Sequence, residues 1–445
     1  MRIALVGTRG APARYGGFET CVEEVGARLS AAGHDVTVYC RGEVDPALQG
    51  RYKGMHLVHL PALRRRALET LSHTLASVLH LVTHRKPDAV VVFNGANSVF
   101  LPLLRARGVP VATHVDGLEW QRAKWGPMGR RYYRMAETLS VRWSDALIAD
   151  ARGIADYYCN QFGADTELIT YGAPRIDRHR VERLVELGLQ RHGYHLVVAR
   201  FEPENNVDLI VGGYVASEAT LPLVVVGSAP YTDAYTQRVR ELADDRVTLL
   251  GGLWDQDLLD QLYAGALTYL HGHSVGGTNP SLLRALGAST ATIAFDVTFN
   301  REVLGQTGRY FQDAHDLGSA VTEAEATPAA TVARGAAAGE RASLYDWDEV
   351  ARSYATLCAD LVRTGSRRSR PSGRRRRGST LPVVPQFRAP APAERRHLTV
   401  PVPADRRRPE GLSPDVVDAE LGASVSPLPA RPEAAADQFV PSQGG

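Results

Sequence analysis

IALVGTRGAPARYGGFET, residues 3–20, is the stretch that decides the fold. Its first five residues form an apolar run typical of a buried strand, and the glycine-rich segment after it leads into a predicted helix from about Glu19 to Ala32. A second β-branched run, DVTVYC at 35–40, follows that helix. This order of strand, helix and strand predicts a parallel α/β unit whose first loop is rich in glycine.

The same alternation continues along the chain in two series. The first adds apolar runs at 55–60, 88–94, 109–116 and 146–150, with a long helix at 63–83. The second has runs at 195–201, 221–228, 246–252, 266–272 and 291–295. We therefore expect an α/β protein of two doubly wound, Rossmann-like domains, 1–173 and 174–345, followed by a helix at 346–364 with Asp346 as its N-cap.

Length and composition limit the class of protein. A chain of 445 residues is too long for one hydrophobic core, which agrees with two domains. With 44% hydrophobic and 22% charged residues it resembles ordinary soluble proteins, and no apolar run is long enough to cross a membrane. Four cysteines without CxxC spacing indicate neither a zinc site nor a disulfide framework. We expect a cytoplasmic protein.

Residues 365–445 differ in character from the rest of the chain. They hold 13 of the 26 prolines and 14 arginines, and they lack helical or strand periodicity. Such a segment buries too little apolar surface to offset its ordering entropy, so we predict a disordered tail. Its arginine-rich run at 367–378 either contacts anionic lipid or nucleic acid or is simply solvated. The overall net charge of +2 favours the solvated tail, and we expect no nucleic-acid partner.

Ligands of parallel sheets bind at the carboxyl ends of the strands, so the loops after the strands are the candidate site. The first loop brings Gly16 and Gly17 to the start of a helix, where free backbone N–H groups favour a phosphate or a sugar hydroxyl. Its spacing is not GxGxxG, which argues against a dinucleotide-dependent oxidoreductase. The alternative is that these glycines only shape the turn.

The second loop, THVDGLEWQRAKW at 113–125, places His114 and Asp116 directly after a strand. Two residues apart on an extended chain, their side chains point to the same side and suit a hydroxyl or developing positive charge. A histidine at a buried strand end is also a common structural hydrogen-bonding group. Trp120 and Trp125 either stack on a sugar ring or fill the seam between the domains.

The third region combines ARFEPENNVDL at 199–209 with HGHSVGGTNPSLL at 271–283. Arg200 follows a strand and suits two hydrogen bonds to phosphate oxygens, and Asn206 is placed to cap the next helix. In the second segment, two glycines precede a helix start whose first amides favour an anion. His271 and His273 have no carboxylate near them in sequence, so we expect no metal site.

These four motifs resemble, in order and in sequence, a bacterial rhamnosyltransferase-like branch of the retaining, family 4-like nucleotide-sugar glycosyltransferases. The resemblance covers residues 1 to about 363. It implies the GT-B fold, in which two Rossmann-like domains face a cleft. The C-terminal domain would bind the donor and the N-terminal domain the acceptor, and the helix at 346–364 would cross back to the N-terminal domain.

Site residues follow from their positions in these motifs. Arg200 would neutralise the donor diphosphate, and the expected catalytic set is Asp116, His114 and Arg200. The donor would be held by Gly16, Gly17, Arg200, Asn205, His273, Gly276, Gly277, Thr278, Asn279 and Arg284. The acceptor side would be formed by Tyr15, Glu119 and Trp120.

The chain departs from the wider family at three positions. The family commonly has a lysine where this chain has Asn205, and glutamates where it has Gly276 and Arg284. The resemblance implies that the second glutamate contacts the nucleotide ribose. Asn205 and Gly276 are shared within the branch. Arg284 is less typical of it, so either the ribose contact or the nucleotide itself is expected to differ from the wider family.

We therefore expect transfer of a hexose or deoxyhexose, specifically rhamnose from a dTDP donor, to a lipid-linked or polysaccharide acceptor. The resemblance implies retention of configuration, and arginine with helix amides can stabilise the leaving diphosphate without a metal or other cofactor. A non-catalytic sugar-nucleotide sensor or scaffold with the same fold remains the alternative, on account of Asn205 and Arg284. A sugar-nucleotide epimerase would need a different set of carboxylates and histidines.

The helix at 63–83 bears on membrane contact. It begins LRRRALETL, and its apolar stripe consists of Leu71, Leu75, Val78, Leu79 and Val82. A basic amphipathic helix of this kind either rests on anionic lipid, at the inner face of the plasma membrane, or packs its apolar side on the sheet.

Overall fold

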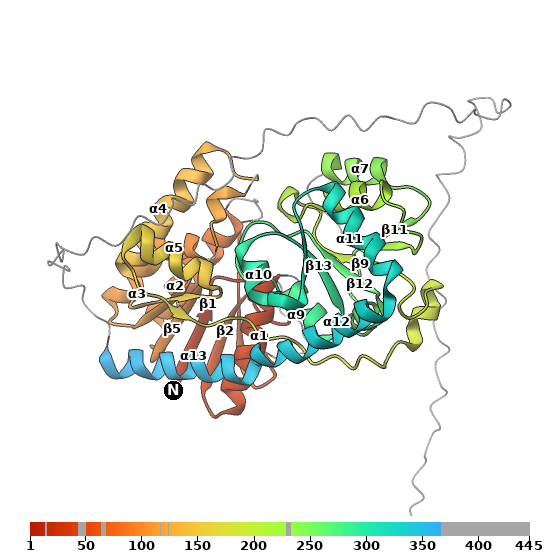
Figure 1. The fold of residues 1–445 in the computed structure, drawn as a ribbon. Helices are drawn as coiled ribbons and strands as arrows, with labels where there is room; N and C mark the ends of the chain where they lie inside the picture. Colours follow the sequence, from red (N-terminus) through yellow and green to blue (C-terminus); the bar gives the residue numbers. More distant parts are fainter. Residues whose placement is uncertain are drawn as a thin grey trace, which may run out of the picture. The chain divides into compact units, whose positions relative to one another are not determined.

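The computed structural model describes residues 1–13, 16–42, 50–63, 68–115, 117–122, 124–227 and 233–365. They belong to one compact unit and contain two sheets with helices on both faces (Figure 1). The prediction of two Rossmann-like α/β halves is confirmed. The predicted disordered tail lies, from residue 366 on, outside the described residues, as do Tyr15 and Asp116.

Eight described strands form the N-terminal sheet, in the order β3-β4-β2-β1-β5-β6-β7-β8. Neighbouring strands are parallel except for β3 and β4. The strands are β1 Arg2–Val6, β2 Asp35–Arg41, β3 Arg51–Tyr52, β4 Met55–Leu60, β5 Ala89–Phe93, β6 Val111–His114, β7 Ala146–Ala149 and β8 Glu167–Leu168. The helices are α1 Gly17–Ala31, α2 Glu69–Thr83, α3 Leu101–Ala106, α4 Pro127–Trp143 and α5 Arg152–Phe162, with the 3-10 turns η2 Gly95–Phe100 and η3 Glu119–Gln121.

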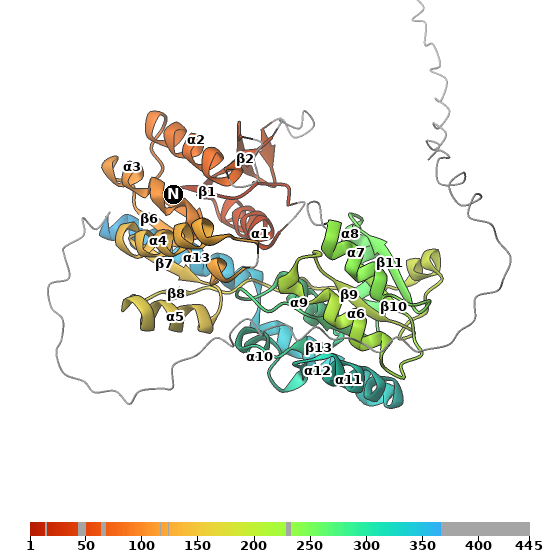
Figure 2. The ribbon, with the colours of Figure 1, turned by 90° about the horizontal axis from the view of Figure 1, so that it is seen from above.

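Six described strands, all parallel, form the C-terminal sheet in the order β11-β10-β9-β12-β13-β14. They are β9 His195–Val198, β10 Leu223–Val226, β11 Val247–Gly251, β12 Thr268–His271, β13 Ala291–Phe295 and β14 Arg309–Phe311. The helices are α6 Val207–Val215, α7 Asp233–Leu242, α8 Gln256–Gly265, α9 Pro280–Gly287, α10 Thr298–Leu304, α11 Ala314–Ala326 and α12 Pro328–Arg341. The 3-10 turns are η4 Glu182–Leu187, η5 Pro203–Asn205, η6 Gly305–Thr307 and η7 Ala342–Leu344. In Figure 2, α11 and α12 lie beside β13, which both contact.

Burial on both faces explains why the strands read as continuous apolar runs. In β1, Ile3 and Leu5 pack in the core that includes α1, while Ala4 and Val6 pack in the core that includes α2. The predicted runs match the strands of the structure, whereas the very short strands β3, β8 and β14 were not predicted. Strands of two or three residues carry too little periodicity to be recognised.

The last helix, α13 Trp347–Thr364, packs on α1 of the N-terminal half (Figure 1). Asp346 is its N-cap, as predicted, and its side chain accepts hydrogen bonds from the next backbone amides at 348 and 349. The hydroxyl of Tyr354 lies 3.7 Å from the sulfur of Cys21 on α1. Arg28 of α1 forms a 2.6 Å ion pair with Asp348. The final described helix therefore completes the core beside the first sheet.

Helix α2 does not bury only its apolar side, as an amphipathic helix packed on a sheet would. Its buried residues include the polar His73, Thr74 and Ser77 beside two aliphatic ones, Val78 and Leu81. The His73 ring satisfies the backbone carbonyl of Cys40 at 2.9 Å, which explains a polar group on this face. Leucines on the other side are exposed, with 43% exposure at Leu68, 37% at Leu75 and 47% at Leu79.

Candidate active site

Loops at the carboxyl ends of the two sheets touch each other. A Cβ atom on Gly117, in the loop after β6, would lie 2.5 Å from Cα of Gly276, in the loop after β12. A Cβ atom on Gly17, at the start of α1, would lie 3.0 Å from the ring of Pro280 at the start of α9. Since side chains there would clash, glycine allows this approach. The structure therefore brings the three sequence-predicted loops together.

Arg200 follows β9 and borders this junction. Its side chain is 36% exposed, and one guanidinium nitrogen lies 3.5 Å from a carboxylate oxygen of Glu202. Its backbone carbonyl accepts a 2.8 Å hydrogen bond from the Asn205 amide. A half-exposed guanidinium at a strand end can reach a ligand phosphate without moving a buried group.

His273 lies between two guanidinium groups. Burial, followed by the nearby charges of Arg122, His271 and Arg200, holds the pKa of His273 well below its ordinary value. Its Nδ1 lies 2.9 Å from Oδ1 of Asn205, so a neutral ring donates there and presents Nε2 as an acceptor. Asn205, where the wider family commonly has a lysine, therefore orients His273 and carries no charge.

Arg122 links the two halves. Its guanidinium pairs with Glu119 on its own loop and lies 3.1 Å from Glu204 after β9. Burial lowers the pKa of Arg122, but the two carboxylates outweigh burial and raise it. Glu204 is 5% exposed, and its Oε2 has no hydrogen-bond partner. One buried carboxylate oxygen at the junction is therefore unsatisfied by the protein.

The start of α9 is partly capped by its own side chains. Asn279 accepts a 2.9 Å hydrogen bond from the backbone N–H of Ser281, which leaves this amide unavailable to a ligand. The Thr278 hydroxyl donates to the backbone carbonyl of Asp150 at 2.7 Å. Gly276 has φ of 142°, a conformation that favours glycine. Pro280 has no amide hydrogen, and the amides of Leu282 and Leu283 donate to the carbonyl of Asn279, so the first helix amides are not open to an anion as the sequence predicted. The helix dipole still favours negative charge here.

His114 is sealed in an aromatic cluster at the end of β6. Its ring stacks on Tyr171 at 5.8 Å and on Phe93 at 5.5 Å, with Phe18 edge-on. Burial lowers the pKa of His114 to about 3, so the ring is neutral. Neither ring nitrogen has a hydrogen-bond partner. This arrangement fits a neutral, packed ring and not an imidazolium ion.

A carboxyl group occupies the start of α1. Glu19 accepts a 3.0 Å hydrogen bond from the backbone of Arg9, and a Cβ atom on Gly16 would lie 2.4 Å from the other carboxylate oxygen. Burial raises the pKa of Glu19, although hydrogen bonds and the charges of Arg9 and Arg41 oppose this. A carboxyl group beside these glycines disfavours a phosphate and favours hydroxyl groups.

Several predicted residues lie elsewhere. Arg284 turns to α8, where it pairs with Asp260. Trp120 lies under the guanidinium of Arg134 on α4, and Trp125 donates to Glu119 at 3.3 Å. The tryptophans thus pack in the N-terminal half, and Arg122 of the same loop reaches Glu204 in the C-terminal half.

The predicted side-chain cap by Asn206 is wrong. Asn206 is the N-cap residue of α6 by position, but its side chain donates to the carbonyl of Gly272 at 2.7 Å and makes no capping hydrogen bond. Its φ of 48° places it in the left-handed region, where an asparagine is tolerated. Asn206 therefore connects the loops after β9 and β12.

Sequence reasoning missed Arg122, Glu204 and Asp150. Arg122 and Glu204 lie within two residues of predicted ones, but they are 82 residues apart in the chain, so the sequence gives no sign that they pair. The available signal for Asp150 was an acid directly after the fully apolar strand β7. Within the described ranges, no group of three or more His, Cys, Asp or Glu residues could hold a metal ion.

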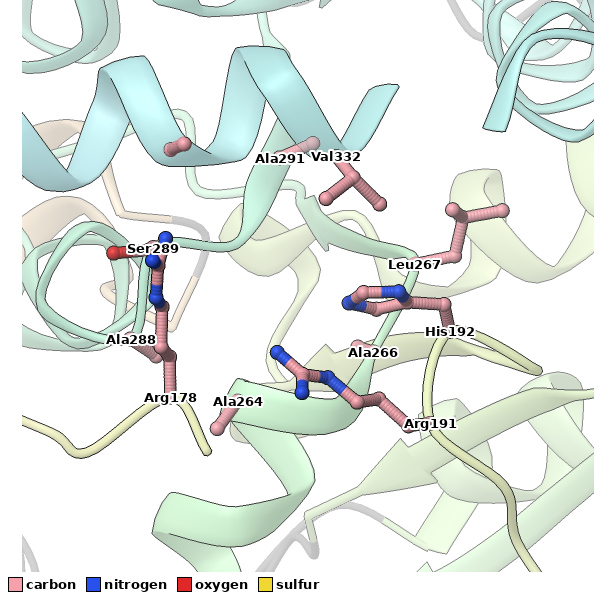
Figure 3. Close-up of a pocket in the computed structure, with 11 residues that line it drawn as sticks. Arg178, Arg191, His192, Ala264, Ala266, Leu267, Ala288, Ser289, Ala291 and Val332 are labelled. Atoms are coloured by element: carbon pink, nitrogen blue, oxygen red, sulfur yellow. The ribbon is translucent and has the colours of Figure 1, made fainter. Parts of the chain in front are cut away.

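Two cavities lie away from this junction. One, of about 30 Å³, has room for about one water and lies at the amino ends of β12 and β13, with Arg178, Arg191 and His192 around it (Figure 3). The other, of about 620 Å³, is lined by residues 173–176 and by the start of α13. Neither of these two is lined by a predicted site residue.

Family models match both halves of the chain. The model described as Glycosyl transferase 4-like domain matches residues 16–172, and the model described as Glycosyl transferases group 1 matches residues 193–325. Together they span more than half of the chain. A comparison with curated proteins finds no match.

Solved structures share the fold. Sucrose-phosphate synthase from Thermosynechococcus elongatus superposes with a TM-score of 0.71 at 21% identity, covering 82% of this chain and 99% of that one. HepE from Anabaena in complex with UDP has a TM-score of 0.65 at 15% identity, covering 81% and 100%. A glycosyltransferase from Rickettsia africae has a TM-score of 0.63 at 13% identity, covering 81% and 98%.

The family models and the fold agree with the position of the junction. Both sheets present their carboxyl ends there, which is where a doubly wound fold binds its ligand. The chain therefore belongs to the GT-B-fold glycosyltransferases of group 1 and the family 4-like type, enzymes that transfer a sugar from a nucleotide-sugar donor.

Proposed function

We propose that the chain transfers a hexose or deoxyhexose, specifically rhamnose from a dTDP donor, to a lipid-linked or polysaccharide acceptor. The observation that carries this proposal is the junction of loops from both sheets, with Arg200 and the start of α9 on the C-terminal side. A guanidinium and the positive end of a helix dipole at one place suit a diphosphate. The donor diphosphate would therefore bind at the C-terminal sheet.

The acceptor would bind on the N-terminal side. Glu19 and Glu119 supply carboxyl groups, which suit hydroxyl groups better than phosphates, whereas His114 is sealed behind aromatic rings. Trp120 lies next to Glu119 on the turn η3 and is held by Arg134. Tyr15 and Asp116 belong to the proposed acceptor-side and catalytic sets but lie outside the described residues.

The reaction would break the bond between the sugar C1 and the diphosphate oxygen and form one between C1 and an acceptor oxygen. Arg200 and the amides of the loop at 276–279 would stabilise the charge that develops on the leaving diphosphate. The acceptor proton would pass to a phosphate oxygen of the departing nucleotide, on the same face of the sugar. This gives retention without a protein nucleophile and needs no metal ion.

Arg284 supports a deoxyribose nucleotide. The resemblance to the family implies a glutamate at this position that contacts the ribose hydroxyls, whereas Arg284 is occupied by Asp260. A dTDP donor lacks the 2′-hydroxyl and loses less without that contact than a UDP donor does. Because Anabaena HepE binds UDP, UDP sugars are the necessary comparison.

Peripheral membrane contact fits a lipid-linked acceptor. The exposed leucines are Leu68, just before α2, and Leu75 and Leu79 on it. They follow the basic run at 64–66 in sequence, and those three arginines lie outside the described residues. Exposed leucines next to basic residues suit the headgroup region of anionic lipid at the cytoplasmic face. Along the described part of the chain, no helix is long and apolar enough to cross a membrane.

Flotation with vesicles tests the membrane contact. We expect the full chain to float with vesicles that contain phosphatidylglycerol and not with neutral ones, and the double variant Leu75→Glu and Leu79→Glu to lose flotation. Leu81→Ala, at a buried position of the same helix, is the matched control for altered stability. Equal flotation of the wild type and the double variant would remove α2 from the contact.

The test of the function is donor binding and sugar release by the full chain against dTDP, UDP and GDP sugars. Selective binding of dTDP-rhamnose with slow release of rhamnose, and transfer when acceptor lipid is added, is the expected result. Selective turnover of a UDP sugar would overturn the proposed donor. Binding without release or transfer under any condition would favour the sensor or scaffold, the alternative that Asn205 and Arg284 suggest.

A further inference from the structure

Asp150 is a buried acid that the proposed reaction does not use. It follows β7 directly and is 7% exposed. The neighbouring strand is β6, which carries His114, and Val115 after it donates to the carbonyl of Ile148 at 2.9 Å. One carboxyl oxygen, Oδ1, has no hydrogen-bond partner. An unsatisfied polar atom in this position needs a physical explanation.

Asp150 contacts the donor loop from two sides. Its backbone carbonyl accepts the hydroxyl of Thr278 at 2.7 Å, and its carboxyl group hydrogen-bonds to the backbone of Thr278. A Cβ atom on Gly277 would lie 2.0 Å from Oδ1, so the loop backbone passes directly against the carboxyl group. One residue of the N-terminal half therefore holds the loop that carries the proposed diphosphate site.

The titratable groups that face Asp150 supply no compensating cation. They are Glu302 on α10, Tyr171 after β8, Cys21 on α1 and Tyr354 on α13. Glu302 accepts a 2.9 Å hydrogen bond from the backbone of Arg152 at the start of α5, and the Arg152 side chain is mostly exposed. Burial first, and then the charge of Glu302, raises the pKa of Asp150 to about 7. Near neutral pH the carboxyl group is therefore present in both forms.

We propose that Asp150 is a positioning residue for the donor: its neutral form keeps the contact with the loop at Gly277 and Thr278 without adding charge, whereas its ionised form accepts the loop amide more strongly but repels the diphosphate. This inference rests on the proposed donor site. Two negative groups on one short loop are unfavourable, so bound donor favours the neutral carboxyl group. By linkage, ionisation of Asp150 then weakens donor binding by the same factor.

The sign of the pH dependence follows from this linkage. Donor binding raises the pKa of Asp150 further, so donor affinity is highest below the pKa of the free protein and falls as the pH rises through about 7. A shift of one pKa unit corresponds to about a tenfold loss of affinity. The diphosphate of a nucleotide sugar keeps a constant charge from pH 6 to pH 8, so the protein is the source of the change.

The test is titration calorimetry of the full chain with dTDP-rhamnose and UDP-glucose at pH 6 and pH 8. We expect the wild type to bind at least one of them about tenfold more weakly at pH 8. Asp150→Asn, a neutral isostere, is expected to bind with nearly equal affinity at both pH values. Thr278→Val removes a hydrogen bond and no charge, so it is expected to weaken binding at both pH values and to keep the tenfold ratio.

The outcomes separate the two proposals. Wild-type affinity that does not change with pH, or an equal change in Asp150→Asn, overturns the role of Asp150 and leaves the donor site intact. No binding of either nucleotide sugar at either pH overturns both this inference and the donor site on which it depends. The wild-type ratio decides the matter even if Asp150→Asn proves unstable, which thermal unfolding of the variant would detect.

Discussion

The two sheets bring opposite chemistry to one junction. The N-terminal strand ends present carboxyl groups whose pKa is raised by burial, Glu19 and Asp150, and a neutral histidine, His114. The C-terminal strand ends present Arg200 and the start of α9. This difference indicates that a negatively charged ligand group binds at the C-terminal sheet and that neutral hydroxyl groups bind at the N-terminal sheet. Arg122 is an exception, a cation from the N-terminal side.

The largest effect, a loss of stability, is expected when Arg122 is removed. Arg122→Ala leaves the buried Glu204 without its cation, while Glu119 keeps Lys124 at 3.0 Å, and the loss costs about 3–5 kcal/mol of unfolding free energy. Chemical denaturation of the purified variant measures it. Arg122→Met combined with Glu119→Gln and Glu204→Gln removes all three charges and is expected to recover most of the loss. A loss below about 1 kcal/mol for Arg122→Ala would show that the pairs are solvated.

Removal of Arg200 tests whether the C-terminal sheet binds the negatively charged diphosphate. Arg200→Ala is expected to lower turnover by at least about a hundredfold, because the leaving diphosphate loses a charge-assisted hydrogen bond. Release of nucleoside diphosphate reports the rate, and thermal unfolding checks that the fold persists. Glu19→Gln, on the N-terminal side, is the matched change and is expected to alter turnover far less. Equal losses in the two variants would end the distinction between the sheets.

A third variant contrasts Asp150 with a partly buried acid, Glu325, whose role is structural. Burial alone would raise the pKa of Glu325, but hydrogen bonds from His195, Thr220 and Leu221 outweigh it and lower the pKa to about 2. This stabilisation is present above the ordinary carboxyl pKa of 4.5 and is lost as the pH falls from there towards 2.

Glu325→Gln is therefore expected to cost about 2 kcal/mol at pH 7 and to weaken the acid dependence of stability between pH 4.5 and 2. Urea unfolding across that range measures both effects. Donor affinity is expected to stay unchanged, since Glu325 lies at the amino end of β9, away from the junction. Loss of stability with an unaltered acid dependence would contradict the assigned ionisation.

The smallest effect is expected at the start of α9. Asn279→Ala removes the cap on Ser281 and is expected to cost about 1 kcal/mol of stability. Asn279→Asp keeps a capping oxygen but adds a negative charge, so stability is expected to persist while donor affinity falls about tenfold. Thermal unfolding and donor titration of both variants separate capping from ligand charge. Unchanged donor affinity in Asn279→Asp would move the diphosphate away from this helix.

The sequence predicted the fold well because buried parallel strands are continuous apolar runs. The strand runs, the glycine loop before α1 and the Asp346 cap all follow from local pattern. The site was predicted only by its loops. That Arg284 faces α8 and that Arg122 meets Glu204 depend on packing between distant segments, which local pattern does not carry.

Helix α2 illustrates the same limit within one element. Its periodicity shows an apolar stripe but not which side meets the sheet, and hydrogen bonding of His73 to the carbonyl of Cys40 decides that a polar side is buried. Likewise, Asn206 resembles a cap in sequence, while the carbonyl of Gly272, far along the chain, takes its amide. Tertiary partners override local preference at these positions.

The contact of α13 with α1 has a consequence for the order of events during synthesis. Cys21 and Phe93 emerge from the ribosome early, but Tyr354, which covers both, is made more than 250 residues later. Until then the first sheet is translated without one of its covering helices and exposes apolar surface that holdase chaperones recognise. We therefore expect the chain to be most prone to aggregation during synthesis, after the N-terminal half is made and before α13 is.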